Sequence, residues 1–120
     1  MSRHAVLVTG GRDYADIDAV DAVVNELPPE TLIVNGGADG ADSLVNEAAI
    51  KYGYPCATLP FYHWHGRAGG HIRNGDMVEI VRALRDAGWL VKVVAFPGGR
   101  GTANCVQQAR AAGLPIQHVE

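Results

Sequence analysis

The chain has 120 residues, of which 48% are hydrophobic and 19% are charged, and its formal net charge at pH 7 is −3. This length fits one domain with its own core, and the composition excludes an intrinsically disordered chain. The negative net charge argues against binding nucleic acid through bulk electrostatics, so nucleic acid is not an expected partner, although a local basic patch is compatible with this balance.

The location of the protein follows from what the sequence lacks. No apolar run approaches the roughly 20 residues that span a bilayer, and the residues after Met1 enter a strand without a signal peptide. Cys56 and Cys105 form neither a CxxC pair nor a disulfide framework. We therefore expect a cytoplasmic protein, with no membrane partner and no cofactor, that folds as a single domain over residues 1–120.

The first half of the sequence alternates between apolar runs and helical stripes. Residues 5–8 predict a strand buried on both faces. The next stripe stops at Pro28-Pro29 and comprises Ile17, Val20, Val24 and Leu27. Residues 31–34 predict a second buried strand, followed by a helix that runs toward Gly53, marked by Leu44, Ala48 and Ala49. Residues 56–59 predict a third strand, with Cys56 in its core.

The second half continues the alternation after a polar and aromatic loop at residues 60–70. An amphipathic helix that ends near Gly88 is predicted by the stripe of Met77, Ile80, Val81 and Leu84. Residues 90–96 predict a fourth strand. A glycine-rich turn separates that strand from a helix that is marked by Val106 and Ala109 and closed by Gly113. Residues 115–119 predict a last strand.

Buried strands that alternate with helices predict a parallel sheet with right-handed crossovers. We therefore predict an α/β fold, a Rossmann-like three-layer domain with a mostly parallel sheet of about five strands. Three of the predicted strands end in glycine pairs, which are Gly10-Gly11, Gly36-Gly37 and Gly98-Gly99. The carboxyl ends of parallel strands share one edge of a sheet, so these turns should meet at one ligand site.

The turn after the fourth predicted strand is the strongest candidate for a phosphate site. Glycines let the backbone approach a ligand closely, and the unpaired amides at a helix N-terminus attract anions. We expect a phosphate to contact the turn formed by Pro97, Gly98, Gly99, Gly101 and Thr102.

Four motifs, in this order, resemble the YspA, cpYpsA-related branch of the SLOG superfamily. They are Val8–Tyr14, Gly36–Asp42, Gly69–Met77 and the glycine turn after Phe96. The resemblance covers nearly the whole chain and implies a Rossmann-like domain that binds a nucleotide or a nucleotide-derived ligand. The superfamily also contains the LOG cytokinin-activating phosphoribohydrolases and the DprA DNA-processing proteins.

The resemblance implies roles for individual residues. The turn of Gly98, Gly99, Gly101 and Thr102 matches the phosphate-binding turn of LOG enzymes, and Arg73 resembles the arginine that works beside their nucleotide. LOG enzymes carry a catalytic glutamate three residues after the threonine, where this chain has Cys105. A thiol does not replace a carboxylate in cleaving an N-glycosidic bond. LOG relatives are oligomers, so a homo-oligomer, a dimer or larger, is also implied.

Two other turns supply candidate walls of the site. The first turn comprises Thr9, Gly10, Gly11 and Arg12. It either presents backbone amides, a hydroxyl and a guanidinium to an anion, or it is only a tight turn with a solvated arginine. The second resembles a ribose-facing or base-facing loop whose carboxylates accept from hydroxyls; it comprises Gly36, Gly37, Ala38, Asp39 and Asp42. Alternatively, Asp39 caps the helix that follows.

Arg73 and Asn74 precede the Met77 stripe and should lie in the first turn of that helix. A cation there opposes the helix dipole, so Arg73 needs an anionic partner. Cys105 is either a nucleophile activated by a helix N-terminus or an inert buried thiol.

The loop before that helix is expected to cover the ligand, with Trp64 or Tyr62 stacked on a base. His63 and His65 have an H-x-H spacing, but no carboxylate or cysteine at convincing spacing completes a ligand set. We therefore expect no metal.

Together these features predict a domain that binds a nucleotide or nucleotide derivative at the carboxyl edge of the sheet, as a sensor, sequestering or processing module. One rival is a nucleoside 5′-monophosphate phosphoribohydrolase, whose candidate catalytic residues are Arg73, Asp39, Asp42 and Asp76. The other rival is single-stranded DNA binding, as in the DprA proteins.

Overall fold

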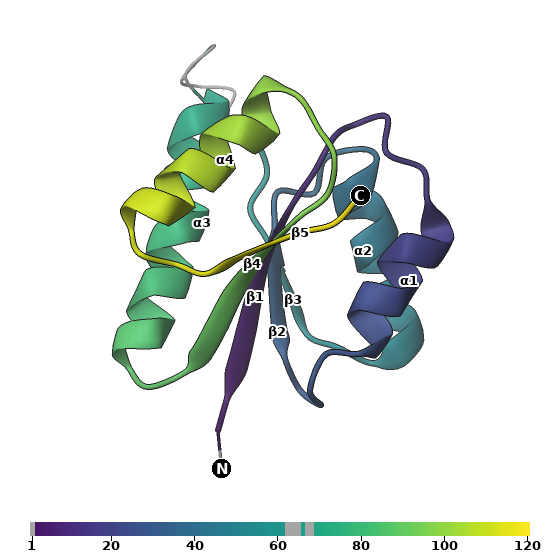
Figure 1. The fold of residues 1–120 in the computed structure, drawn as a ribbon, viewed down its shortest axis with the longest axis horizontal. Coiled ribbons are helices and arrows are strands. Elements are labelled where there is room, and N and C mark those ends of the chain that lie inside the picture. The colour runs from purple at the N-terminus through teal and green to yellow at the C-terminus, as the bar shows by residue number, and fades with distance from the viewer. Residues whose placement is uncertain (1, 62–65, 67–68) are drawn as a thin grey trace.

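The computed structural model describes residues 2–61, 66 and 69–120. Strands and helices alternate along these residues (Figure 1). They are β1 (His4–Thr9), α1 (Ile17–Asn25), β2 (Leu32–Asn35), α2 (Ala41–Tyr52), β3 (Cys56–Thr58), α3 (Gly69–Asp86), β4 (Leu90–Ala95), α4 (Arg100–Ala111) and β5 (Ile116–His118). None of the helices described here is long and apolar enough to cross a membrane.

Among the described residues, five strands form one sheet in the order β3-β2-β1-β4-β5, and every neighbouring pair is parallel. The helices α1 and α2 pack together on one face, and α3 and α4 pack on the other (Figure 1). The predicted Rossmann-like α/β fold is therefore confirmed. The strand order reverses at β1, which lies between β2 and β4, and ligands of such folds bind outside the carboxyl ends of the strands at this point.

Each face of the sheet has its own apolar core, because successive residues of β1 point to opposite sides. Val6 and Val8 pack with Val20 of α1 on one side. Leu7 packs with Met77 of α3 on the other. Burial of one such side chain contributes about 1.5–3 kcal/mol. The end of β1 therefore emerges from a strand that is held on both faces, as the apolar run predicts.

Three apolar residues that the sequence places in buried elements are exposed. Ile17, the first residue of α1, is 63% exposed. Leu90 is 55% exposed, because β5 pairs with β4 only from Val93 onward. Ile80 is 36% exposed. The face of α3 that packs against the sheet includes Val78 and not Ile80.

The prediction that Cys56 belongs to the core of its strand is wrong, because this residue is exposed. β3 is an edge strand that pairs with β2 alone. Its middle residue, Ala57, is the one that packs toward the core. A short apolar run does not distinguish a central strand from an edge strand, which is why the sequence misplaces Cys56.

Candidate functional site

A cleft of about 310 Å³, here called the central cleft, lies beside the carboxyl end of β1 and the turn that follows β4. Its walls come from both of these, from the loop before α2 and from the start of α3. It brings together most of the residues predicted from the sequence, which are Thr9, Gly10, Gly11, Arg12, Ala38, Asp42, Arg73, Asn74, Gly99, Gly101 and Thr102. Phe61, Gly70 and His71 line it as well.

The remaining predicted residues of these turns lie in two neighbouring cavities. Gly36, Gly37 and Asp39 line a second cleft of about 310 Å³, here called the side cleft, which shares Arg12 and Arg73 with the central cleft. Pro97 and Gly98 line a cavity of about 400 Å³ between α4 and β5, on the other side of the glycine turn. The predicted single site is therefore divided into adjoining parts.

Two further predictions fall outside these cavities. Asp76 is an exposed residue of α3 and lines none of the three. The expected ligand cover of Tyr62, His63, Trp64 and His65 lies outside the described residues. Within the part of the chain that the structure describes, no three His, Cys, Asp or Glu side chains gather closely enough to hold a metal ion.

The backbone of Gly11 joins the three turns to one another. Its N–H donates to the carbonyl oxygen of Pro97 at 2.9 Å, and its own carbonyl accepts from the N–H of Ala41 at 3.1 Å. Gly40 makes this approach feasible, because its φ is +77° and a Cβ there would lie 2.2 Å from the Gly11 oxygen. The Gly11 amide is thus committed within the protein rather than available to a ligand.

The N-terminus of α4 borders the central cleft without a side-chain cap. Its N-cap residue is Gly99, and no side chain accepts from the first turn. The first helical bond runs from the N–H of Ala103 to the Gly99 carbonyl at 3.0 Å. The amides that precede it in the helix have no partner within α4, as at any helix start, and their dipoles favour an anion.

In the loop before α2, the amides are satisfied by side chains of the protein. Asp42 Oδ2 accepts from the N–H of Gly36 at 3.1 Å and from that of Ala38 at 3.3 Å. Gly37 donates its N–H to Asn35 Oδ1 at 2.9 Å. The alternative that Asp39 caps the following helix is wrong, because α2 begins after Gly40 without a side-chain cap.

Asp42 is a buried carboxylate that lines the central cleft. The residue is 6% exposed, and its second oxygen, Oδ1, is buried without a hydrogen-bond partner in the described part of the chain. Burial raises the pKa of the Asp42 carboxyl, while the two amide hydrogen bonds and the nearby charge of Arg73 act in the opposite direction.

Arg73 lies between the central cleft and the side cleft. Its Nη1 donates to the carbonyl oxygens of Gly36 at 3.0 Å and Leu59 at 3.3 Å, and its Nε donates to Asn74 Oδ1 at 3.1 Å. No described residue accepts from Nη2. The carbonyl oxygens thus hold the guanidinium at the ends of β2 and β3.

The position of Arg73 in its helix differs from the prediction. α3 begins at Gly69, so Arg73 and Asn74 lie in the second helical turn rather than the first. Two glycines and a polar sequence hide this start, since glycine lowers helix propensity by about 1 kcal/mol per residue relative to alanine. Contacts with α4 help to hold the start, including a bond from Gln108 Nε2 to the His71 carbonyl at 3.1 Å.

Asn74 connects Arg73 to the glycine turn. Its Nδ2 donates to the Gly101 carbonyl at 3.2 Å and to Asn104 Oδ1 at 3.1 Å, and Gln108 donates to the same Asn104 oxygen at 2.8 Å. Sequence reasoning missed Asn104 and Gln108. The sequence signal that could have found them is their spacing of four residues, which places two side-chain amides on one side of α4.

Cys105 has the properties of a structural thiol. It is fully buried, and burial raises the pKa of its thiol to about 11, which a hydrogen bond with Thr9 offsets only in part. A nucleophilic cysteine needs the thiolate at neutral pH, whereas this one is protonated. The helix N-terminus therefore does not activate Cys105 as the nucleophile interpretation requires.

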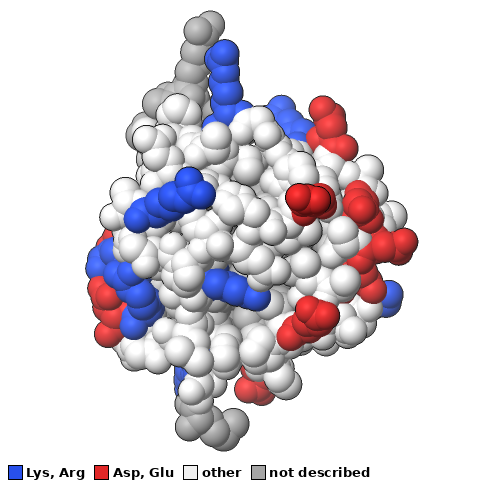
Figure 2. All heavy atoms as spheres, in the orientation of Figure 1, with Lys and Arg blue, Asp and Glu red and all other residues white. Residues whose placement is uncertain are grey.

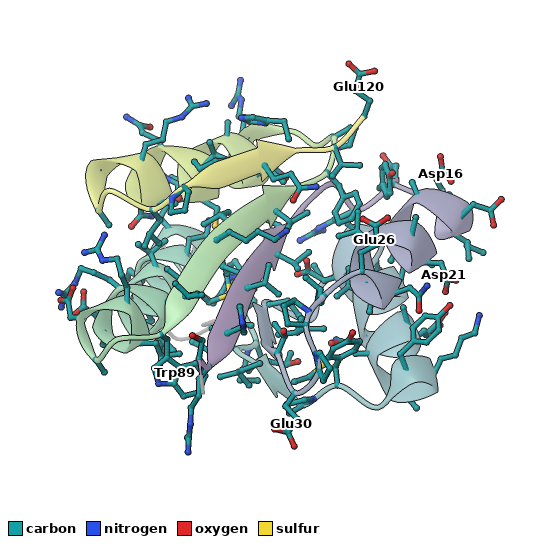
Figure 3. The ribbon with its side chains drawn as sticks, turned by 60° about the horizontal axis from the view of Figure 1, so that its bottom comes forward. Asp16, Asp21, Glu26, Glu30, Trp89 and Glu120 are labelled. Atoms are coloured by element: carbon teal, nitrogen blue, oxygen red, sulfur yellow. The ribbon has the colours of Figure 1, made fainter. Side chains whose placement is uncertain are left out.

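Charge is distributed unevenly over the face of the molecule that Figure 2 shows. In Figure 2, Asp and Glu gather mainly over α1 and α2, while most Lys and Arg side chains lie over α3 and α4. Figure 3 shows Asp16 and Asp21 pointing outward from α1. Among the described residues that line the central cleft, Asp42 is the one carboxylate, beside Arg12 and Arg73. The lining thus has a positive balance that suits an anionic ligand.

Two solved structures are similar in fold. The X-ray structure of TM1055 matches with a TM-score of 0.66 and 20% identity over 97% of this chain and 72% of that chain. DNA processing protein A (DprA) from Streptococcus pneumoniae matches with a TM-score of 0.58 and 18% identity over 96% of this chain. The match spans 58% of DprA. At these identities the likeness concerns the fold alone.

Sequence comparisons assign the family. A model of the YspA, cpYpsA-related SLOG family matches residues 4–61, from β1 to just beyond β3. Gene 61 protein of Mycobacterium phage D29 is 37% identical over 123 residues, which cover 92% of this chain and 92% of the phage protein. The chain therefore belongs to the YspA, cpYpsA-related SLOG family.

Proposed function

We propose that the central cleft binds a nucleotide or nucleotide-derived ligand through its phosphate. The observation that carries the proposal is the meeting of the uncapped α4 N-terminus with Arg12 and Arg73 in one cleft, at the edge where the strand order reverses. Backbone amides and a guanidinium together are a common phosphate site in α/β folds.

The proposed phosphate position is at Gly101 and Thr102, in the first turn of α4. This part of the turn keeps its amides free of a side-chain cap, whereas those of Gly11, Gly36 and Ala38 already have acceptors. Arg73 Nη2 supplies a charged donor from α3. The sugar and base then extend along the cleft toward Asp42 and Phe61, which also line it.

Binding, rather than hydrolysis, is the function that the residues support best. Cys105 stands where LOG enzymes carry their catalytic glutamate, and it is fully buried with the pKa of its thiol raised to about 11. We therefore propose a module that senses or sequesters its ligand. Release of free base from a nucleoside monophosphate would contradict this proposal in favour of a phosphoribohydrolase.

A thermal-shift screen tests the proposal, with inorganic phosphate, ribonucleoside mono- and diphosphates, cyclic nucleotides and ADP-ribose as probes. A probe at 100 times its dissociation constant should stabilise the protein by about 2.7 kcal/mol. The Arg73→Lys variant keeps a positive charge but loses the forked donor, so the shift should fall. Arg82→Ala is the control, since Arg82 lies on the same helix and pairs with Glu79 and Asp86.

Two results would contradict the proposal. One is the absence of a shift with every probe. The other is a shift that Arg73→Lys and Arg82→Ala leave equally unchanged, because the ligand would then bind elsewhere. Salt-dependent binding of labelled single-stranded DNA without any mononucleotide binding would instead favour a nucleic-acid site.

A further inference from the structure

The cavity between α4 and β5, here called the edge cavity, adjoins the proposed phosphate position. Its volume is about 400 Å³, which is within the usual range for ligand pockets. Gly99 and Thr102 line both this cavity and the central cleft, so the first turn of α4 forms the boundary between the two. A phosphate held at that turn therefore has space for a substituent on either side.

The walls of the edge cavity are mostly apolar, and several of their residues are accessible. One face of α4 supplies Ala103, Val106 and Arg110, which follow one another at intervals of three and four residues. Pro97, in the glycine turn, and Val119, just after β5, line the cavity as well. Pro97 and Ala103 are exposed and Val119 is half-buried, so an occupant can contact them. Such walls suit the apolar faces of a flat ring system.

The polar side chains of the edge cavity suit the edge of such a ring. Gln107 is exposed and carries a carboxamide, which offers a donor and an acceptor side by side. Arg110 Nη2 lies 3.1 Å from His118 Nε2, and no described carboxylate forms an ion pair with this arginine. Glutamine and arginine side chains of this kind recognise the edges of adenine and guanine in nucleic-acid complexes.

The length of the edge cavity fits a nucleoside. Arg110 follows Thr102 by eight positions in α4, which corresponds to a rise of about 12 Å. This is more than a phosphate needs, and it leaves room for a sugar and a base between the first turn of α4 and Arg110.

We propose that the edge cavity binds a second nucleoside, so that the ligand consists of two nucleosides joined through phosphate. The bridging phosphate then lies at Gly101 and Thr102, with one nucleoside in the central cleft and the other in the edge cavity. This inference rests on the proposed function and names the class of its ligand.

Calorimetric titration with bridged and unbridged probes tests the inference. The bridged probes are diadenosine 5′,5′-diphosphate and the dinucleotide adenylyl-3′,5′-adenosine, with their guanosine counterparts. The unbridged probes are ADP, AMP, GDP and GMP, which keep the phosphates and lack the second nucleoside. Burial of a group as large as an apolar side chain strengthens binding by about ten- to a hundredfold. At least one bridged probe should exceed its unbridged counterpart by about this factor in the wild-type protein.

Ala103→Trp is the informative variant because it fills the edge cavity from an exposed position of α4. In this variant, the bridged probe and its unbridged counterpart should bind within about threefold of each other. Ala111→Trp is the matched control, since Ala111 is exposed on the same helix and lines none of the three cavities. It should keep the wild-type preference. Circular dichroism confirms folding, and the ratio of affinities within one variant is insensitive to a modest loss of stability.

A second pair of variants tests whether the occupant is a base. Gln107→Ala removes the carboxamide without filling the cavity and should reduce the preference for the bridged probe by about two- to tenfold. Gln117→Ala is its control, because Gln117 accepts from Lys92 at 2.8 Å and lines none of the three cavities. This control should leave the preference unchanged.

The outcomes separate the two proposals. Equal affinity of bridged and unbridged probes for the wild-type protein contradicts the inference and leaves the proposed function intact. A preference that survives Ala103→Trp also contradicts it, because the second nucleoside would then lie outside the edge cavity. So does a preference that Gln107→Ala leaves unchanged, since no base edge would then contact the carboxamide. Failure of every probe to bind contradicts the proposed function, and the inference with it.

Discussion

The guanidinium of Arg73 lies directly against the backbone of Gly36. Nη1 donates to the Gly36 carbonyl at 3.0 Å, and a Cβ added to Gly36 would lie 2.1 Å from the same nitrogen. Gly36, the first residue after β2, therefore leaves room for the charged side chain of Arg73 from α3. The loop that resembles a ribose-facing or base-facing loop therefore packs, at Gly36, against the side chain of Arg73.

The Gly36→Ala variant should displace Arg73. We expect the overpacking to lower the free energy of unfolding by about 1–3 kcal/mol, as measured by urea denaturation, and to weaken nucleotide binding. Gly101→Ala is the matched control for stability alone, because its added Cβ meets no atom within 4 Å but the residue belongs to the proposed phosphate position. That change, inside α4, should raise stability by up to about 1 kcal/mol. A Gly36→Ala protein as stable as wild type would refute this close packing.

The amide network between α3 and α4 should show energetic coupling. Asn74 is 4% exposed, and Asn74→Ala should lower the unfolding free energy by about 1–3 kcal/mol because it leaves buried partners unsatisfied. A double-mutant cycle with Asn104→Ala should give a coupling energy of about 0.5–3 kcal/mol. The same cycle with Gln107→Ala, an exposed neighbour, should be additive within about 0.5 kcal/mol. Additivity in both cycles would contradict the network.

The two cysteines should differ in reactivity. Ellman's reagent at about pH 8 should modify Cys56 in the native protein, because this residue is exposed, and should spare Cys105, which is buried with its thiol pKa raised to about 11. Both should react in denaturant. A Cys56→Ser protein that still reacts quickly in its native state would show that Cys105 is accessible after all.

The buried carboxyl of Asp42 should make stability depend on pH. Burial raises the pKa of this carboxyl in the folded state above its ordinary value of 3.8, so the native state binds the proton more tightly than the unfolded state does. The contribution of this group to the unfolding free energy therefore falls as pH rises from about 3.8 through the native pKa. Asp42→Asn, which carries no charge, should gain stability relative to wild type over this range.

Urea denaturation between about pH 4 and pH 8 measures the difference in unfolding free energy between Asp42→Asn and the wild-type protein. The difference between Asp42→Asn and wild type should narrow toward the acid end, where the wild-type carboxyl is protonated. Asp39→Asn controls for the loss of one carboxylate from the same loop. A gap that widens on acidification would mean that the ionised carboxylate stabilises the fold.

The fold was predictable because its signals are local. The continuous apolar run at residues 5–8 reflects a strand buried on both faces, and the stripes of α1 and α4 each reflect one buried helix face. Edge position is not local, so the exposure of Cys56 on β3 was not predictable. Nor was the start of α3 at Gly69, which depends on partners in α4 that are far away in the sequence.

The site was predictable in outline but not in its hydrogen bonding. Glycine turns at strand ends indicate which backbone segments meet, and most of the predicted residues do line one cleft. The sequence does not show whether an amide in such a turn faces a ligand or a side chain of the protein. Asp42 takes the amides of Gly36 and Ala38, and only the three-dimensional arrangement distinguishes this carboxylate from the exposed Asp39.

Self-association and a cytoplasmic location stay predictions. Light scattering tests the first, since a homo-oligomer is expected from the resemblance to LOG enzymes. A mass equal to that of one 12.7 kDa chain would contradict it.

The two hydrogen bonds of Gly11 also bear on how a ligand would be received. They connect the end of β1 to Pro97 and Ala41 in series, and we expect these bonds to restrict independent motion of the three turns. The entropy lost in ordering them is then lost during folding and not on binding, which favours affinity. Slow hydrogen exchange at the Gly11 and Ala41 amides in the absence of ligand would indicate that the binding site is preorganised.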